Sequence, residues 1–225
     1  MKKLVFVLIT FLVLSCSSIK VLDTWKGDNS NITKFKNKNV LVLGRTADDH
    51  SRIAFEEAIA NNLREQGIKA TESFIKAPKI NPKQEFTKER IEFIKSLMAS
   101  EGFNAIVITS IKDKQQITRS TNSGIYMGAT YGNYYPVGYG TFYDYFALPY
   151  IGGSYYSAYG DYITNSVSTT TETKYILETA AYNLDEPKEG QLVAILTTSI
   201  NNPKDAYKTA DAYVQKLVSA FEKAQ

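Results

Sequence analysis

Two short runs of aliphatic residues constrain this chain most: residues 40–43 read VLVL and residues 105–108 read AIVI. A run without polar alternation is typical of a strand that is buried on both faces of a sheet. Such a sheet needs helices on both sides. The chain between the two runs supplies them, because apolar residues recur at helical spacing in two stretches, Phe55-Ile59-Leu63 and Ile91-Ile94-Leu97-Met98. The pattern predicts a layered α/β domain.

The rest of the chain adds strands and a final helix. Residues 68–73 are a weaker strand candidate, residues 167–182 alternate as a strand does, and residues 192–196 are a further aliphatic run after a polar turn. Asn202 and Asp205 fit the two ends of a capping box at the start of the C-terminal helix, with Pro203 as its first residue. We predict the order β-α-β-α-β, a long Tyr/Gly-rich insertion, a β-hairpin and a C-terminal helix, around a mixed sheet.

The N-terminus has the pattern of an export signal. Lys2 and Lys3 form a basic start, and residues 4–14 are apolar except for Thr10. This apolar stretch is about half as long as a membrane-spanning helix needs to be, and it has the usual length of a signal-peptide core. After Ser15 comes Cys16, the only cysteine in the chain. We therefore expect residues 1–15 to be a signal peptide.

The sequence Val13-Leu14-Ser15-Cys16 resembles the lipobox of bacterial lipoproteins. The resemblance implies that Cys16 is the lipidation site, carrying diacylglycerol on its sulfur and, after cleavage, an acyl chain such as palmitate on its amino group. Two or more acyl chains hold a protein stably at a membrane. Because Ser17 rather than Asp follows the cysteine, the resemblance also implies the outer membrane, facing the periplasm. The alternative is an ordinary secretory signal with a chance cysteine.

The sequence divides into three parts. After the signal peptide, residues 16–36 are rich in polar side chains and are predicted to be a tether. Trp25 and Ile32 are the two residues in it that we expect to dock onto the domain. Residues 37–225 are predicted to be a single α/β domain with the Tyr/Gly-rich insertion at residues 119–165.

The arrangement of this domain resembles small periplasmic α/β lipoprotein domains of the CsgG, LpoB and TolB N-terminal type. The resemblance rests on the strand at residues 39–44, a helix that ends near Gly67 and a strand that starts at Asn104. It implies a binding or scaffold role rather than catalysis. A fold alone does not define a function, so this remains an expectation.

The insertion has the most unusual composition. Twelve of the 16 tyrosines and seven of the 13 glycines lie between Tyr126 and Tyr162, where Asp144 and Asp161 are the only charged residues. Tyrosine is common on recognition surfaces because its large ring carries a polar tip. The candidate contact residues are Tyr131, Tyr134, Tyr135, Tyr139, Tyr143, Tyr145, Tyr155 and Tyr156. The partner would be an envelope protein, a glycan or a membrane surface. Two alternatives remain: the tyrosines cover the sheet, or the segment is mobile and self-associating.

Charge and composition argue against several classes of function. Lys and Arg total 26 and Asp and Glu total 23, and two of the basic residues lie in the predicted signal. A nearly neutral domain gives no electrostatic reason to expect nucleic acid as a partner. With a single cysteine and a single histidine, His50, the chain has neither an internal disulfide nor a multi-histidine metal centre. Glycine-rich nucleotide motifs and a GxSxG elbow are absent, so we expect no cofactor.

Asp48-Asp49-His50 is the one group that invites a metal or acid–base interpretation. It lies between a predicted strand and a predicted helix, where active sites of α/β proteins often lie. Capping of the helix by Asp48, Asp49 or Ser51 explains the same residues. We therefore predict a non-enzymatic, lipid-anchored binding or scaffold module without catalytic residues. The alternatives are an envelope hydrolase that uses carboxylates or a hydroxyl, and a glycan-binding module that uses the Tyr-rich segment.

Overall fold

The computed structural model describes residues 18–76, 87–120, 141–143 and 169–223. In these ranges six strands form one sheet in the order β1-β6-β5-β4-β2-β3. The strands are β1 (Ile19–Lys26), β2 (Asn39–Arg45), β3 (Lys69–Glu72), β4 (Ala105–Ser120), β5 (Thr169–Asn183) and β6 (Leu192–Asn201). The helices are α1 (Asn29–Phe35), α2 (Asp49–Glu65), α3 (Ser73–Lys76), α4 (Lys88–Ser100) and α6 (Ala206–Lys223), with a 3-10 turn, η1, at Lys188–Gly190.

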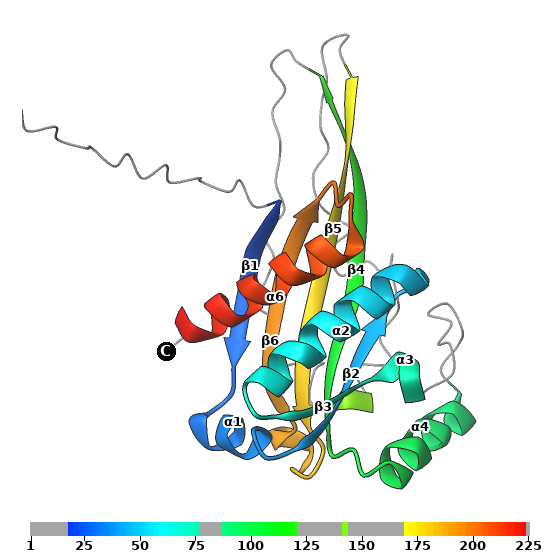
Figure 1. Ribbon diagram of the computed structural model, residues 1–225, viewed down its shortest axis with the longest axis vertical. Helices are drawn as coiled ribbons and strands as arrows, with labels where there is room; N and C mark the ends of the chain where they lie inside the picture. The colour runs from blue at the N-terminus through cyan, green and yellow to red at the C-terminus, as the bar shows by residue number, and fades with distance from the viewer. Residues whose placement is uncertain (1–17, 77–86, 121–140, 144–168, 224–225) are drawn as a thin grey trace, which may run out of the picture.

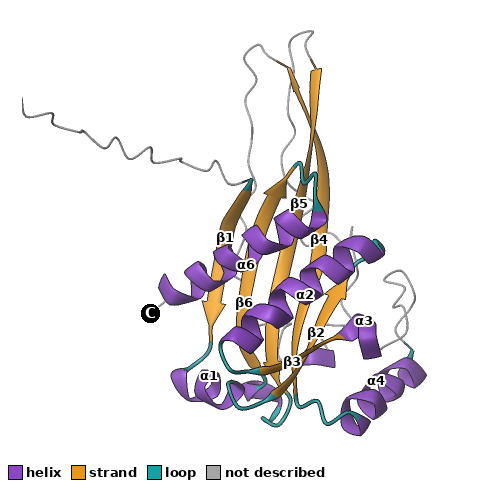
Figure 2. Cartoon of the chain, in the orientation of Figure 1, coloured by secondary structure: helices purple, strands orange, loops and turns teal. Residues whose placement is uncertain are grey.

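The sheet is mixed, as the sequence predicts. β2 runs parallel to β3 and β4, whereas β4, β5, β6 and β1 pair in antiparallel fashion. The parallel and antiparallel parts of the sheet meet at β4. β5 and β6 form the predicted hairpin, and the weak strand candidate at residues 68–73 is the edge strand β3. The layered α/β class is confirmed (Figures 1 and 2).

The aliphatic run of β2 contributes side chains to two hydrophobic cores, one on each face of the sheet. Val40 and Val42 belong to the core beneath α2 and α6, which lie side by side across one face (Figure 1). Leu41 and Leu43 belong to the core on the opposite face, which includes Met98 of α4. Successive strand residues point to opposite faces, so an uninterrupted run is what a strand between two helical layers requires.

The predicted tether is wrong for most of its length. Residues 19–26 form the edge strand β1, which pairs with β6, and residues 29–35 form α1. Trp25 packs against one core and Ile32 against the other, so the two docking residues are confirmed. Of the described residues, only Ser18 lies before the domain begins. The polar composition reflects an edge strand with one covered side, not a linker.

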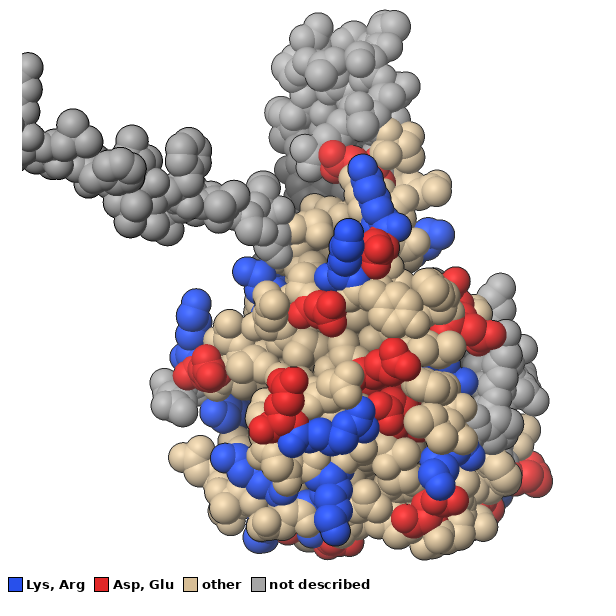
Figure 3. Space-filling view, viewed as in Figure 1, with Lys and Arg blue, Asp and Glu red and all other residues tan. Residues whose placement is uncertain are grey.

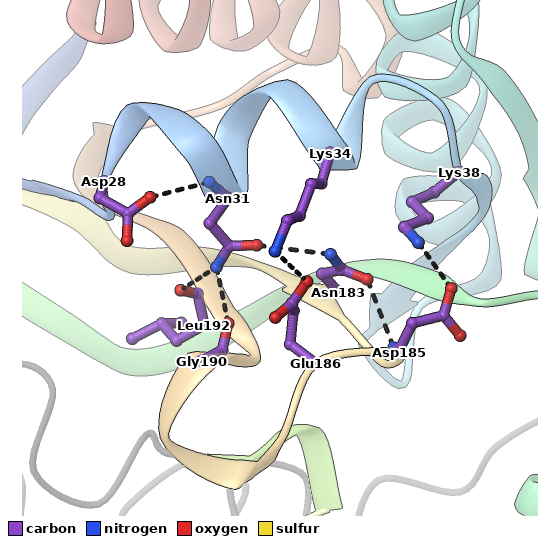
Figure 4. Close-up of polar contacts among 9 residues, drawn as sticks. All are labelled: Asp28, Asn31, Lys34, Lys38, Asn183, Asp185, Glu186, Gly190 and Leu192. Carbon is purple, nitrogen blue, oxygen red and sulfur yellow. Dashed lines mark hydrogen bonds and ion pairs between the residues drawn. The ribbon is translucent and has the colours of Figure 1, made fainter.

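α1 is held to the turn between β5 and β6 by polar contacts (Figure 4). Asp28 caps the helix by accepting the Asn31 backbone N–H at 2.8 Å. The buried Asn31 amide donates to the carbonyl oxygens of Gly190 at 2.6 Å and Leu192 at 3.3 Å. Two exposed ion pairs join the same elements, Lys34–Glu186 at 2.9 Å and Lys38–Asp185 at 2.6 Å.

The C-terminal helix begins later than predicted. Asp205, not Asn202, is the capping residue, because its carboxylate accepts the Lys208 backbone N–H at 2.9 Å. Asn202 has a φ of 47° and its side-chain oxygen accepts the Thr173 backbone N–H at 2.6 Å. A residue before proline avoids the helical region, and asparagine tolerates the left-handed one. Asn202 therefore closes the chain turn after β6.

β4 and β5 extend beyond their neighbours as a two-stranded ribbon, here called the β4–β5 arm (residues 116–120 and 169–173). The pairing runs on to Ser120 opposite Thr169, whereas β6 ends at Asn201 opposite Lys174. Five residues of strand span about 17 Å. The arm rises from the upper end of the sheet in Figure 1, the end at which β1 also starts. It leads into the predicted Tyr/Gly-rich insertion, of which the structure describes residues 119, 120 and 141–143.

Candidate functional site

A cleft of about 530 Å³ lies on the face of the sheet that carries α2 and α6. Its walls are the first turns of these two helices, and its floor is formed by β4, β5 and β6. Parallel strand β2 ends at the cleft with Arg45, so the cleft lies at the carboxyl end of a parallel strand, where ligands of α/β proteins commonly bind. Known ligand sites fall in the same size range.

The floor of the cleft is mainly apolar. Phe55 of α2, Ile111 of β4 and Leu177 of β5 face it, and Tyr175 and Ile200 continue it toward the end of the sheet. Beneath it, the Tyr213 hydroxyl and the Thr179 hydroxyl lie 2.6 Å apart, and burial raises the pKa of Tyr213 to about 12. Tyr213 is therefore neutral at physiological pH and acts as a packing residue with a satisfied hydroxyl.

Two carboxylates on the rim belong to helix caps. Asp48 accepts the Ser51 backbone N–H at 2.6 Å and Asp205 caps α6 in the same way. The hydrogen bond from the Ser51 backbone holds the pKa of Asp48 below its ordinary value. Asp48 is therefore an anion at neutral pH and a poor proton donor. Capping thus accounts for Asp48, as the sequence allows.

The same rim holds two lysines. Lys114 Nζ lies over the ring of Tyr175, 5.6 Å from the ring centroid. Lys204 stands next to the capping Asp205 and is exposed. Neither lysine forms an ion pair with another side chain in the part of the chain that the structure describes. Over the face in Figure 3, basic and acidic side chains are interspersed rather than separated.

His50 lines the cleft and packs against Tyr207 at the start of α6. Its ring meets the ring of Tyr207 edge-on, with centroids 5.3 Å apart. No group of three or more His, Cys, Asp or Glu side chains in the described ranges is placed to hold a metal ion. The cleft does contain Asp48, His50 and Ser51, the residue types that a hydrolase would need.

Arg52 and Glu56 form a buried network at the inner end of the cleft. Glu56 is fully buried and accepts the Gly44 backbone N–H at 2.8 Å, Arg52 Nε at 2.9 Å and the Ser73 hydroxyl at 2.7 Å. Its second oxygen accepts the Phe74 backbone N–H at 2.8 Å. The network joins β2, α2 and the start of α3. Because every one of these partners is part of the scaffold, the network holds the wall of the cleft in place.

A second buried ion pair lies on the opposite face of the sheet. Lys112 Nζ is 3.1 Å from Glu178 Oε1, and both side chains are almost completely enclosed. Lys112 occupies the bulge in β4, where the register with β5 shifts. Burial lowers the pKa of Lys112, while Glu178 opposes this shift. The sequence pattern of β4 does not reveal the pair, because the bulge breaks the alternation of that strand.

The structure reaches few of the candidate residues named from the sequence. Cys16 lies outside the described residues, and so do Tyr131, Tyr134, Tyr135, Tyr139, Tyr145, Tyr155 and Tyr156. Tyr143 is described and is half-buried. Its ring lies 5.1 Å from that of the fully buried Phe142, and Lys95 Nζ lies 5.3 Å from the Tyr143 ring centroid. For Tyr143, the alternative that tyrosines cover the sheet fits better than an open contact surface.

Sequence reasoning did not find the cleft itself. Asp48, Ser51 and Asp205 were recognised as capping candidates, but Lys114, Lys204 and Tyr175 carry no local signal. The cleft exists because α6 packs beside α2 over strands from both halves of the chain. The only sequence signal for it is indirect: two helix starts that each follow a strand.

Comparisons with known proteins give little further guidance. No family model matches the chain, and no curated protein matches it either. Among solved structures, the PelC dodecamer from Paraburkholderia phytofirmans is 12% identical, with a TM-score of 0.39 over 86% of this chain and 90% of that chain. Among the described residues, no helix is long and apolar enough to cross a membrane.

Proposed function

We propose that this protein is a lipid-anchored binding module of the cell envelope, attached through Cys16 at the periplasmic face of the outer membrane. The position of β1 carries this proposal. β1 begins at Ile19, so only Ser17 and Ser18 separate the lipobox cysteine from the sheet. Three residues of chain reach at most about 10 Å. A lipidated Cys16 would therefore hold one defined end of the domain close to the membrane surface.

The same end of the sheet carries the β4–β5 arm. Ile19 is paired with Ile200, Ile200 with Tyr175 and Tyr175 with Lys114, so these four residues form one row across four strands. The arm ends about 20 Å beyond this row. The chain enters and leaves the Tyr/Gly-rich insertion at the far end of the arm. We expect the insertion to meet a partner, an envelope protein or a glycan, as its composition favours, whereas its described residues Phe142 and Tyr143 pack against Tyr182 and Lys95 of the domain.

The test is to replace Cys16 with alanine in the full chain. We expect the variant to leave the membrane fraction or to accumulate with its signal uncleaved, and to lose the mass of the lipid. Ser18→Ala, two residues along and outside the lipobox, is the matched control and should behave as the wild type. If Cys16→Ala has the same membrane partition and the same lipid content as the wild type, the anchor is wrong.

The contact surface needs a separate test. Replacing Tyr131, Tyr134, Tyr155 and Tyr156 together with serine keeps the fully buried Phe142 and should leave a folded domain. Proteins cross-linked to the wild type in intact envelopes should be lost from this variant. An unchanged set of cross-linked partners, with an unchanged melting temperature, would assign the contacts to another surface.

A hydrolase remains the second candidate, because Asp48, His50 and Ser51 line one cleft. The contacts favour capping over catalysis, since the Ser51 backbone N–H donates to Asp48 and the His50 ring packs edge-on against Tyr207. Ester and amide model substrates should therefore be turned over no faster by the wild type than by Ser51→Ala. A rate that depends on Ser51 and on His50 would favour the enzyme.

A further inference from the structure

The cleft and the predicted anchor lie at the same end of the sheet. Three residues of the row that starts at Ile19 line the cleft, namely Ile200, Tyr175 and Lys114. Strands in a sheet are about 4.8 Å apart, so β1 and β4 are separated by about 14 Å. A lipid anchor three residues before Ile19 would thus bring the membrane surface within reach of the cleft mouth.

The cleft combines an apolar floor with two exposed cations and two exposed anions on its rim, and the buried Arg45 lines it at the end of β2. Lys114 and Lys204 supply two cations, and Asp48 and Asp205 supply two anions. All four side chains are exposed at the rim. Each carboxylate accepts a helix N–H through Oδ1, and Asp48 also interacts with the Ser51 side chain. An ionised carboxylate has about four acceptor sites, so each can accept a further donor. Arg52, the remaining cation of the helix wall, is engaged by Glu56.

This combination matches one class of ligand. A phosphate group suits ammonium side chains, an amine suits carboxylates, and an aliphatic chain suits the apolar floor. A free phosphate would leave the floor and the carboxylates unused, and an uncharged amphiphile would leave all four charges unused. The zwitterionic headgroup of a phospholipid, with the first part of its acyl chains, uses every element of the cleft.

We propose that the cleft between α2 and α6 binds the headgroup of a zwitterionic phospholipid from the membrane to which the protein is anchored. Lys114 and Lys204 contact the phosphate, Asp48 and Asp205 contact the ammonium group, and the acyl chains begin along Ile111, Tyr175 and Ile200. This inference rests on the proposed lipid anchor for its biological setting. The binding itself involves only the described domain.

The experiment titrates the full, lipid-bearing chain in sugar-headgroup detergent with soluble probes. These are a short-chain phosphatidylethanolamine, a short-chain phosphatidylglycerol of the same chain length, and inorganic phosphate. Binding is followed by the melting temperature and by the backbone amide shifts of Gly44 and Thr46, which line the cleft. We expect saturable binding of phosphatidylethanolamine, weaker binding of phosphatidylglycerol and the weakest binding of phosphate.

Variants separate the two sets of charges. Lys114→Gln combined with Lys204→Gln should weaken the binding of phosphatidylethanolamine about fivefold to tenfold, as expected for the loss of two exposed charge contacts. Lys36→Gln with Lys69→Gln removes the same charge from exposed sites outside the cleft and should have no effect. Asp205→Asn keeps the helix cap, because asparagine caps as well as aspartate does. It should nevertheless reverse the preference between the two lipids.

Each outcome decides the proposal. Equal affinities for phosphate and phosphatidylethanolamine would mean a free-phosphate site, and equal affinities for the two lipids in the wild type would remove the role of the carboxylates. Binding that is unaffected by the lysine variants, or no binding at all, would also overturn it. A failure of the anchor is distinguished by the Cys16→Ala fractionation, which does not involve the cleft.

Discussion

Asn31→Ala tests whether the segment after Cys16 is part of the folded domain. If residues 16–36 were a tether, this change would have no effect on folding. In the structure the Asn31 amide is buried and donates to the carbonyl oxygens of Gly190 and Leu192. The side-chain oxygen of Asn31 also accepts a hydrogen bond from Asn183 Nδ2 at 3.4 Å. The substitution removes the side chain that joins α1 to the β5–β6 turn (Figure 4).

The expected loss can be worked out from these contacts. Each of the two donated hydrogen bonds contributes about 1 kcal/mol, and leaving a buried carbonyl unpaired adds to the cost. The total loss is about 2–3 kcal/mol. Alanine is the better helix former, which offsets about 0.5 kcal/mol. For a domain of this size, a net loss of about 2 kcal/mol lowers Tm by about 4–8 °C.

The assay is urea denaturation of the purified variants, followed by circular dichroism. Asn29→Ala is the control, because Asn29 lies on the same helix, is exposed and receives the same gain in helix propensity. We expect Asn31→Ala to unfold at a clearly lower urea concentration than Asn29→Ala, with the same m value. Equal midpoints for the two variants would refute the docking of α1 onto the domain.

Two further predictions concern α2. Glu56→Gln leaves the buried Arg52 without its counter-charge and turns an N–H₂ group toward backbone donors, so we expect a loss of about 3–5 kcal/mol in the free energy of unfolding, against less than about 0.5 kcal/mol for Glu57→Gln. An unchanged Tm for Glu56→Gln would contradict the stabilising role of the Arg52–Glu56 network. Because the pKa of Asp48 is lower in the folded state than its ordinary value of 3.8, the stability that its charge provides is present above pH 3.8 and is lost as the pH falls through the folded-state pKa. The wild type should therefore exceed Asp48→Asn in free energy of unfolding at neutral pH, and this difference should shrink below pH 4. Denaturation measured over a pH series checks this, and a difference that stays constant with pH would argue against the linkage.

The sequence predicts the centre of the fold better than its edges. The runs in β2 and β4 are visible because both faces of each strand are buried. β1 is hidden for the opposite reason. Ile19 is its only buried residue, and a bulge between Val21 and Asp23 breaks the alternation that would reveal a strand. Its partner β6 comes from the other end of the chain, so no local pattern predicts the pairing.

The cleft shows the same limit. The helix caps at Asp48 and Asp205 can be predicted one at a time, because each depends on neighbours three residues away. Their approach depends on α6 packing against α2, which follows from the position of β6 in the sheet. Lys114 lines the cleft because the bulge at Lys112 resets which side chains of β4 face α2. A tertiary arrangement of this kind has no one-dimensional signature.

The pairing of β1 with β6 has a mechanical consequence. If the chain is held at Cys16, a pull on the domain enters at Ile19 and runs along the axis of β1. The hydrogen bonds to β6 lie across that axis, so they are loaded together in shear instead of being opened one after another. At the far end of β1, the Lys26 ammonium donates a hydrogen bond to the Phe221 carbonyl oxygen, 195 residues away in the chain. The pairing of β1 with β6 would thus resist unfolding of the domain when force is applied through the anchor.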